Sequence, residues 1–474
     1  MGKFRNRIVL VALLVMSVFA GARPVQAAPR QAELTDAQLL TEVQRRACRF
    51  FWDESDPHTG LTKDRADNTG SDTYTVASIA STGYALASLP VAVTHHWTDR
   101  RAAYARALVT LRFVHDRLPQ VHGWYYHFID QHTGERVWKC EISSIDTTLL
   151  IEGALMAGQF WPHTEVSCLA ADLNERLDWT WMRSNGGGSP QKRVVSMGWH
   201  PEDGFIASNW DRYDELMQLY LLGMSSHRDP LPADSWNAWE RNKIEYGGLT
   251  ALAGGPIFLH EMSHLYFNFR DQRDSSGWDY WVSSTNAVKI NRQFCIDKSA
   301  GRKSYGPDLW GLNASDAPDG YRAYSAPGSD EDGTLSPTGA IAALLFTPEA
   351  SQAAGQAMYA RVKAKCWGRY GFGDAFNLDK DWYDKDVIGI DLGMALLAIE
   401  DARTGLPWKL MASHPGLRRA WKLAGFHTTH EPSPRPLQKP PVPGKGKSVS
   451  ARIDTRTRFA RLDSERKRQK TAAL

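Results

Sequence analysis

The stretch CEISSIDTTLLIEGALMAG (140–158) is polar and acidic at its start and then continues as an apolar helical segment. NWDRYDELMQLYLLG (209–223) and VIGIDLGMALLAIEDA (387–402) repeat this design. A helix that is apolar on every side is expected to lie inside the protein, surrounded by other helices. If the starts of these helices lie on one side, they bring several carboxylates to one rim: Glu141, Asp146, Asp214, Glu215 and Asp391. The pattern therefore predicts an all-α fold, an α/α barrel with a carboxylate-lined bowl.

Helical patterns also occur on both sides of these stretches. TDAQLLTEVQRRACRFFW (35–52) and DRRAAYARALVTLRFVHDRL (99–118) each place apolar residues on one helical face. Extended pieces on both sides of QHTG (131–134) predict a β-hairpin. Further helices are expected at 145–161, 214–223, 338–345, 349–363 and 389–403.

Composition and charge narrow the class of protein. Of the 474 residues, 42% are hydrophobic and 23% are charged, which is typical of a soluble globular protein. The chain has 18 Trp, 16 Tyr and 17 Phe, whose flat rings can stack on sugars or bases. The net charge is only +3, and the basic excess is concentrated after Glu431, so the body of the chain is acidic. An acidic body argues against a nucleic-acid partner.

The two ends of the chain differ from its body. MGKFRNR, the apolar run IVLVALLVMSVFAGA and small residues near position 27 predict a secretory signal peptide over 1–27. We therefore expect a periplasmic or secreted bacterial protein with no integral membrane segment after signal removal. Residues 431–474 are Pro-rich and basic, which predicts a disordered tail; contact with an anionic surface is the alternative. The folded domain is expected over 28–430. Five cysteines leave room for one or two disulfides.

Acidic residues at helix starts have two interpretations. They can simply cap the helix and interact favourably with its dipole. They can also form a catalytic pair, in which a desolvated carboxyl acts as an acid and a better solvated one stays ionised as base or nucleophile. Such pairs, together with sugar-stacking Trp, are what hydrolysis of a glycosidic bond requires.

A family resemblance favours the second interpretation. The motifs that carry it include CEISSIDTTLLIEGAL, MGWHPEDGFIASNWDRYDELMQLYLLG, YGPDLWGLNASDAPDGY, GRYGFGDAFN and WYDKDVIGIDLG, in this order between about residues 38 and 426. Together they resemble the bacterial glucoamylase-like domain family that includes β-1,2-glucanases (sophorohydrolases). The resemblance implies an (α/α)6 barrel with short β-hairpins in its loops. It also implies hydrolysis of β-1,2-glucan to short oligosaccharides with inversion and without a cofactor.

The resemblance identifies the motifs, and the roles of proton donor and proton acceptor have to be assigned among their carboxylates. We expect Glu215 to be the general acid and Asp391 the general base. Asp146 and Glu141 compete for these roles, and either could instead hold the sugar next to the cleaved bond. Further candidates for substrate binding are Trp210, Tyr213, Asp214, His260, Tyr305, Trp310, Trp367 and Asp374.

Two other motifs suggest metal sites. HEMSH (260–264) has the spacing of a zinc peptidase motif, but position 270 is Arg and no Glu occurs between Glu261 and Glu331 to complete a ligand set. We interpret His260 and His264 as structural histidines or, for His260, as a wall of the bowl. DKDWYDKD (379–386) lacks the Gly and terminal Glu of an EF-hand, so a solvated acidic loop is favoured over a calcium site. No metal or cofactor is expected.

Alternative functions assume the same fold but a different reaction. The same barrel could hydrolyse an α-glucan, or transfer a glycosyl group while excluding water. A non-catalytic glucan-binding protein is the alternative from another class. All of these share a glucan partner.

Overall fold

The computed structural model describes residues 34–428. The described residues from Asp36 onward belong to one compact unit. The predicted signal peptide (1–27) and the predicted tail (431–474) lie outside the described residues, so both stay predictions. No helix within residues 34–428 has the length and apolar character needed to cross a bilayer.

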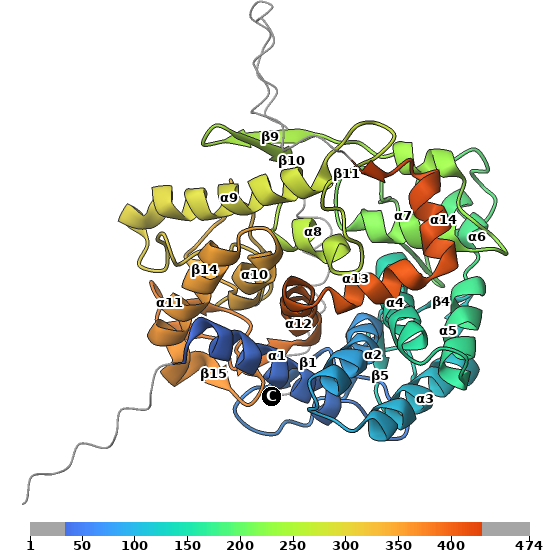
Figure 1. Cartoon of the computed structure of the whole chain (residues 1–474), viewed down its shortest axis with the longest axis horizontal. Helices are drawn as coiled ribbons and strands as arrows, with labels where there is room; N and C mark the ends of the chain where they lie inside the picture. Colours follow the sequence, from blue (N-terminus) through green and yellow to red (C-terminus); the bar gives the residue numbers. More distant parts are fainter. Residues whose placement is uncertain (1–33, 429–474) are drawn as a thin grey trace, which may run out of the picture. The chain divides into compact units, whose positions relative to one another are not determined.

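The compact unit is mainly helical (Figure 1). Its helices are α1 (Asp36–Asp53), α2 (Ile79–Thr94), α3 (Arg100–Asp116), α4 (Ser144–Phe160), α5 (Glu165–Glu175), α6 (Trp179–Ser184), α7 (Leu216–Ser225), α8 (Phe258–Glu261), α9 (Tyr280–Lys298), α10 (Pro337–Ala342), α11 (Pro348–Cys366), α12 (Gly389–Arg403), α13 (Leu406–Ser413) and α14 (Pro415–Leu423). Every helix expected from the sequence is present, although the one expected over 338–345 ends as a 3-10 turn. Helices α2, α5, α6, α8, α9, α13 and α14 had not been predicted.

Short antiparallel strands form hairpins and small sheets between the helices. The predicted hairpin around 131–134 is confirmed by the pairing of Ile129 with Arg136. The strands are β1 (Arg65–Asp67), β2 (Val76–Ser78), β3 (Gln120–Val121), β4 (Trp124–Tyr125), β5 (Phe128–Asp130), β6 (Ile142–Ser143), β7 (Gly198–His200), β8 (Gly204–Phe205), β9 (Lys243–Tyr246), β10 (Leu249–Leu252), β11 (Gln272–Arg273), β12 (Ala314–Ser315), β13 (Arg322–Ala323), β14 (Thr334–Leu335), β15 (Trp367–Gly368), β16 (Gly371–Phe372), β17 (Phe376–Asn377), β18 (Trp382–Tyr383), β19 (Asp386–Ile388) and β20 (His427–Thr428).

The predicted inner helices are confirmed as buried elements. In α4, every residue from Ser144 to Gly158 is buried, and α7 is buried along its whole length. Helix α12 is buried from Asp391 to Asp401. Outer helices such as α3 and α11 bury only one face. This contrast follows from sequence, because only the inner helices are apolar on all sides.

Small residues allow the inner helices to approach closely. A Cβ atom at Gly153 of α4 would overlap the carbonyl oxygen of Gly83 in α2, so only glycine fits this contact. Helix α2 also packs against α1 and α12. Figure 1 shows α1 (blue) next to α12 (dark orange), so the first helix of the unit lies beside a helix from the last part of the described chain.

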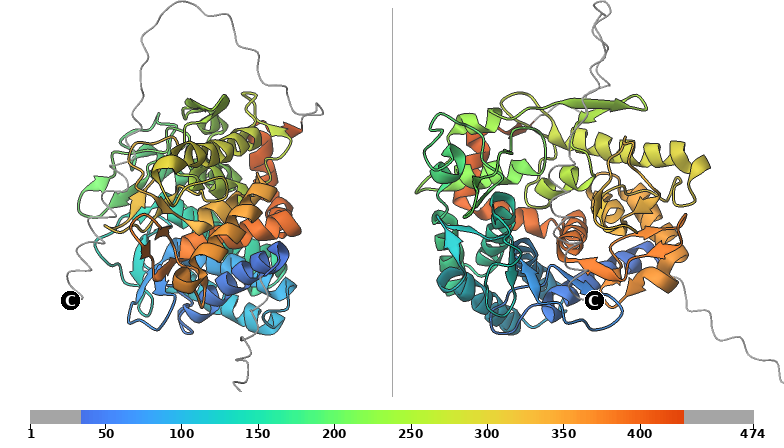
Figure 2. Two further views of the ribbon diagram at one scale, coloured as in Figure 1. Left: turned by 90° about the vertical axis from the view of Figure 1, so that its left-hand side faces the viewer. Right: turned by 180° about the vertical axis from the view of Figure 1, so that it is seen from behind.

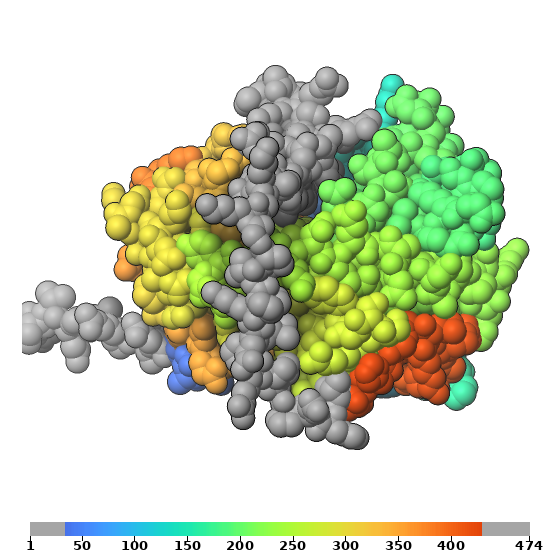
Figure 3. All heavy atoms as spheres, turned by 90° about the horizontal axis from the view of Figure 1, so that it is seen from above, coloured from blue at the N-terminus to red at the C-terminus, as the bar shows by residue number. Residues whose placement is uncertain are grey.

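The N-terminal and C-terminal parts are also joined by strands. Strand β1 pairs with β19 through Arg65–Ile388, Ala66–Val387 and Asp67–Asp386. Figure 2 (left) shows most of the short strands and loops on one side of the unit, with long helices on the other. At the far end of the chain, α14 packs against α7, and Figure 3 shows α14 (red) beside green and yellow middle segments.

All five cysteines are free thiols in this structure. Cys48, Cys140, Cys295 and Cys366 are buried, whereas Cys168 is exposed. The disulfides that the sequence left room for are therefore not formed in this structure.

Candidate active site

A cavity of about 460 Å³ opens where the inner helices α4, α7 and α12 begin. Its size is in the range of small-molecule sites. Four of the five carboxylates predicted to share a rim line this cavity: Glu141, Asp146, Glu215 and Asp391. Asp64 and Asp203 add two more carboxylates that the sequence analysis had not singled out. The prediction that the acidic starts of separate helices converge is therefore confirmed for four residues.

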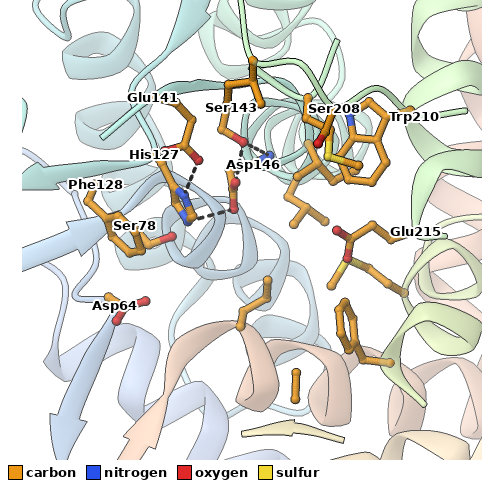
Figure 4. Close-up of a pocket in the computed structure, with 18 of the residues that line it drawn as sticks. Asp64, Ser78, His127, Phe128, Glu141, Ser143, Asp146, Ser208, Trp210 and Glu215 are labelled. Atoms are coloured by element: carbon orange, nitrogen blue, oxygen red, sulfur yellow. Dashed lines mark hydrogen bonds and ion pairs between the residues drawn. The ribbon is translucent and has the colours of Figure 1, made fainter. Parts of the chain in front are cut away.

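Glu215 stands at the N-cap position of α7, yet its side chain makes no capping hydrogen bond. The side chain is turned into the cavity instead and is only 3% exposed (Figure 4). The backbone around it is fixed: its N–H donates to Asp214 Oδ1 over 2.8 Å, and Ser263 Oγ donates to its carbonyl oxygen over 3.1 Å. The simple capping interpretation therefore does not account for Glu215.

Asp214 does not line the cavity, in contrast to the prediction. Its carboxylate accepts the backbone N–H of Glu215, so it fixes the turn that carries its neighbour. A local side-chain-to-backbone bond of this kind is typical of Asp at the start of a helix.

Asp146 lies in the first turn of α4 and faces Glu215 across the cavity (Figure 4). Ser143, the N-cap of α4, donates its hydroxyl to Asp146 Oδ2 over 2.5 Å and accepts the backbone N–H of Asp146. Asp146 Oδ1 lies 3.4 Å from His127 Nε2. The carboxylate is therefore held in one orientation by a hydroxyl and an imidazole.

His127 connects Asp146 with Glu141. Its Nδ1 lies 3.0 Å from Glu141 Oε1, and its ring stacks on Phe128 with centroids 3.8 Å apart. Burial alone would lower the pKa of His127, but the carboxylates of Asp146 and Glu141 raise it to about 9. Burial would likewise raise the pKa of Glu141, but the charge and hydrogen bond of His127 lower it to about 2. At neutral pH, His127 is therefore an imidazolium and Glu141 a carboxylate.

Asp391 approaches the cavity from the first turn of α12. The N-cap of this helix is Ile388, which has no side chain able to cap, and Asp391 is 5% exposed. Asp391 thus comes from a segment far in sequence from both Glu215 and Asp146.

Aromatic and apolar side chains cover the remaining walls. Trp210 lines the cavity, and its indole Nε1–H donates to Ser144 Oγ over 2.8 Å. Phe128, Phe205 and Tyr321 also line it, and none of the three had been predicted. These residues and His127 lie on hairpins and loops, where sequence periodicity gives no signal for the direction of a side chain.

Six other predicted binding residues do not line the cavity: Tyr213, His260, Tyr305, Trp310, Trp367 and Asp374. The Trp310 ring is completely buried, so it cannot stack on a sugar in this structure. Tyr305 donates its hydroxyl to Glu331, and Trp367 packs edge-on against Tyr359 and Phe372. These rings therefore pack inside the protein. The predictions failed because the sequence does not reveal which side of the cavity wall an aromatic ring faces.

The HEMSH motif borders the cavity through Met262, whereas its two histidines do not line it. Its histidines are buried and both approach one hydroxyl, with Ser284 Oγ 3.5 Å from His260 Nδ1 and 3.1 Å from His264 Nε2. Burial lowers the pKa of each imidazole to about 3, so both are neutral. His260 packs against Tyr213, with centroids 4.9 Å apart, and is not a wall of the cavity. The structural interpretation of the motif fits these contacts.

Two comparisons with known proteins give matches. Residues 207–415 match a family model described as "Putative glucoamylase". The chain is 26% identical over 425 residues to an exo β-1,2-glucooligosaccharide sophorohydrolase (non-reducing end) of Parabacteroides distasonis, covering 81% of this chain. The chain spans only 57% of the length of that relative. The resemblance seen in the sequence motifs is thereby confirmed.

Solved structures show the same fold. A protein of Bacteroides uniformis described as a putative glucoamylase superimposes with a TM-score of 0.78 at 28% identity, covering 84% of this chain and 99% of that chain. An endo-β-1,2-glucanase of Chitinophaga pinensis, solved with sophorotriose and glucose, gives a TM-score of 0.76 at 27% identity, covering 83% of this chain and 99% of the other.

Proposed function

We propose that this chain is a glycoside hydrolase that cleaves β-1,2-glucan to short β-1,2-linked oligosaccharides with inversion at the anomeric carbon. One observation carries the proposal: carboxylates from the starts of three separate inner helices meet in one cavity. The two relatives whose activities are known both act on β-1,2-linked glucose chains, which supports this choice of bond.

The proposal includes an (α/α)6 barrel as the scaffold. Buried helices α2, α4, α7 and α12 would belong to its inner ring, and half-buried helices such as α3 and α11 to its outer ring. Loops and short hairpins at the N-terminal ends of the inner helices would then form the bowl. The superposition on the Bacteroides protein supports this arrangement.

Glu215 is the proposed general acid. Its carboxyl is turned into the cavity from a backbone fixed by Asp214 and Ser263, as a proton donor aimed at one oxygen requires. It protonates the glycosidic oxygen while the bond between this oxygen and the anomeric carbon breaks. The leaving sugar departs with a neutral hydroxyl group.

Asp391 is the proposed general base. It takes a proton from a water molecule that attacks the anomeric carbon on the face opposite the leaving group, and the new hydroxyl has the inverted configuration. Asp146 is the second candidate, because it faces Glu215 across the cavity and its carboxylate is held in one orientation by Ser143 and His127. Glu141, ion-paired with His127, suits a role in binding sugar hydroxyls.

Ring stacking is assigned to the aromatic walls of the cavity. Phe205 and Tyr321 are partly exposed and line the cavity, so their faces are accessible to a sugar. Trp210 is almost completely buried and acts as the fixed back of the wall.

We also propose that the mature chain starts near residue 28, folds up to about residue 430 and works in the periplasm or outside the cell. The basis is the sequence of the two ends alone. A glucan made of neutral sugars is compatible with an acidic domain surface.

The experiment separates the acid from the base. Wild type and three variants, Glu215→Gln, Asp391→Asn and Asp146→Asn, are assayed on linear β-1,2-glucan and on β-sophorosyl fluoride, whose leaving group needs no proton. Loss of the acid should abolish glucan cleavage but spare the fluoride, whereas loss of the base should abolish both. Glu349→Gln is the matched control, because Glu349 is an exposed carboxylate in the first turn of the outer helix α11.

The results also decide the function itself. If wild type leaves linear β-1,2-glucan intact, the hydrolase proposal for this bond fails. If Asp146→Asn abolishes turnover of both substrates while Asp391→Asn does not, Asp146 is the base.

A further inference from the structure

A second group of carboxylates lies outside the cavity. Asp316 follows β12, Asp374 lies between β16 and β17, and Asp384 lies between β18 and β19. One carboxylate oxygen of each lies within 4.8 Å of those of the other two. All three residues are buried, with 7%, 2% and 8% of their surface exposed, respectively. We call this group the buried Asp cluster.

Two carboxylates of the cluster are fixed by backbone amides on one side only. The N–H of Asp316 donates to Asp374 Oδ2 over 2.7 Å, and the N–H of Asp386 donates to Asp384 Oδ1 over 3.2 Å. The other oxygens, Asp374 Oδ1 and Asp384 Oδ2, are buried and have no hydrogen-bond donor within residues 34–428. A buried carboxylate oxygen without a donor or cation is costly, so each of these oxygens calls for a partner.

Positive charge near the cluster is scarce. Arg65 donates to Asp316 over 2.6 Å and also lies 3.5 Å from Asp64 and 3.8 Å from Asp386. Thus one guanidinium serves three carboxylates. Neither Asp374 nor Asp384 forms an ion pair within the described part of the chain.

The shortage of positive charge affects the pKa values of Asp374 and Asp384. Burial, followed by the charges of Asp391 and Asp316, raises the pKa of Asp374 well above its usual range. Burial and the neighbouring carboxylates raise the pKa of Asp384 in the same way, against the opposing effect of Arg65. The ionised cluster thus needs an additional positive charge.

We propose that the buried Asp cluster binds a divalent cation with Asp316, Asp374 and Asp384 as ligands, and that Ca²⁺ is the ion that fits. Ca²⁺ binds carboxylate oxygens at about 2.3–2.6 Å, so two oxygens on the same ion lie no more than ~5 Å apart. The spacing within 4.8 Å satisfies this limit. A set of oxygen ligands without His or Cys disfavours zinc, which prefers nitrogen and sulfur.

The site would join three loops that lie far apart in the sequence or are separated by strands. Asp384 lies just before β19, and β19 leads directly into α12, whose first turn carries Asp391. An ion held by Asp316, Asp374 and Asp384 would therefore fix the segment that delivers the proposed base. This role is structural and does not depend on the proposed reaction.

The proposal revises two predictions from the sequence. DKDWYDKD was interpreted as a solvated acidic loop, but its Asp384 is buried in the cluster. Asp374, expected to bind substrate, is a cation ligand instead. The motif contributes one ligand to a site assembled from three loops, which explains why it does not match the spacing of an EF-hand.

The test measures binding to the whole purified chain after treatment with EDTA. Isothermal titration with CaCl₂ should give one saturable site per chain, and CaCl₂ should raise the melting temperature. The double variant Asp374→Asn/Asp384→Asn should lose both effects. Asp381→Asn should keep them, because Asp381 lies in the same loop but is exposed and paired with Lys365. MgCl₂ and ZnCl₂ are titrated in parallel.

Stability without calcium provides a second readout. In EDTA the double variant should melt no lower than wild type, because it has lost two buried carboxylates that lack a cation. Absence of calcium binding by wild type would overturn the proposal, and a proton shared with Asp391 would then explain the unpaired oxygens. Equal calcium binding by the double variant would also overturn it, and tighter binding of Mg²⁺ or Zn²⁺ would overturn the assignment to calcium. None of these readouts requires that the chain cleave glucan.

Discussion

Two carboxylate groups lie near the starts of the inner helices, and they differ in how their charge is balanced. In the cavity, Glu141 and Asp146 flank one imidazolium, His127, at 3.0 and 3.4 Å. In the buried Asp cluster, Asp374 and Asp384 have no such cation within the described residues. The first group is therefore complete within the chain, whereas the second requires an ion or protons from outside. The comparison shows that the role of a cluster of acidic residues can be inferred only when the positive charges around it are counted as well.

The largest effect is expected at a carboxylate that belongs to neither group. Glu215→Gln removes the proton that the proposed mechanism delivers to the leaving oxygen, and general acid assistance is worth roughly 10²–10⁴-fold in rate. We expect kcat on linear β-1,2-glucan to fall by about this factor while the melting temperature changes little. A variant with near-wild-type turnover would remove Glu215 from the mechanism.

The balance within the cavity predicts a dependence of stability on pH. The folded state raises the pKa of His127 to about 9 from the ordinary histidine value of 6.5, so the resulting stabilisation is complete below 6.5 and is lost as the pH rises through 9. His127→Gln removes this dependence, which amounts to at most about 3 kcal/mol. Melting curves of both proteins between pH 6 and 10 should converge at the alkaline end. Parallel curves would show that the neighbouring carboxylates do not raise the pKa of His127.

Removing one acid of the cavity group should destabilise the protein. Glu141→Gln replaces a charged hydrogen bond to His127 with a neutral one, and bonds of this kind contribute roughly 1.5–3 kcal/mol. Urea unfolding at neutral pH measures the loss, and NMR titration should show a lower pKa for His127. An unchanged His127 pKa would contradict the described pairing.

Removing one acid of the buried Asp cluster should have the opposite sign in the absence of calcium. Asp374→Asn eliminates a buried charge without a cation, and such uncompensated groups cost about 1–3 kcal/mol. In EDTA we expect unfolding at equal or higher urea concentration than wild type. If this variant is as destabilised as Glu141→Gln, the two groups do not differ in how their charge is balanced.

The smallest effect is expected from the end of the chain. Deletion of residues 431–474 should change neither kcat on soluble glucan nor the response to CaCl₂, because both carboxylate groups are formed by residues between Asp64 and Asp391. Assays of the truncated and full chains side by side check this. A substantial loss of turnover would give the tail a role in handling the substrate.

The sequence predicted three of the buried helices, α4, α7 and α12, because their signal is strong and local, but it missed the buried helix α2. The long apolar runs of α4, α7 and α12 identify buried helices, and the acids at their starts identify the rim. The sequence could not place His127, Phe128 or Tyr321, since these residues lie on hairpins and loops whose geometry depends on distant contacts. The same limit applies to Trp310 and Trp367, which pack away from the cavity.

Which acidic residues cluster together, and which cations balance them, was even harder to predict from the sequence than the positions of the loop residues. Asp316, Asp374 and Asp384 are separated by up to 68 positions, and no spacing rule connects them. Conversely, the H-E-x-x-H spacing suggested a metal site, whereas in the structure both histidines approach Ser284 and are buried. The sequence motif that suggested a metal site and the carboxylate cluster whose geometry suits a cation are therefore formed by different residues.

The most direct test of the central claim is the configuration of the first product. Proton NMR is recorded during the first minutes of digestion of linear β-1,2-glucan, before the anomers equilibrate. The inverting mechanism predicts that the new reducing end appears first as the α-anomer, the inverted form. Initial release of the β-anomer would show retention and contradict a mechanism in which Glu215 acts as acid and a second carboxylate activates water.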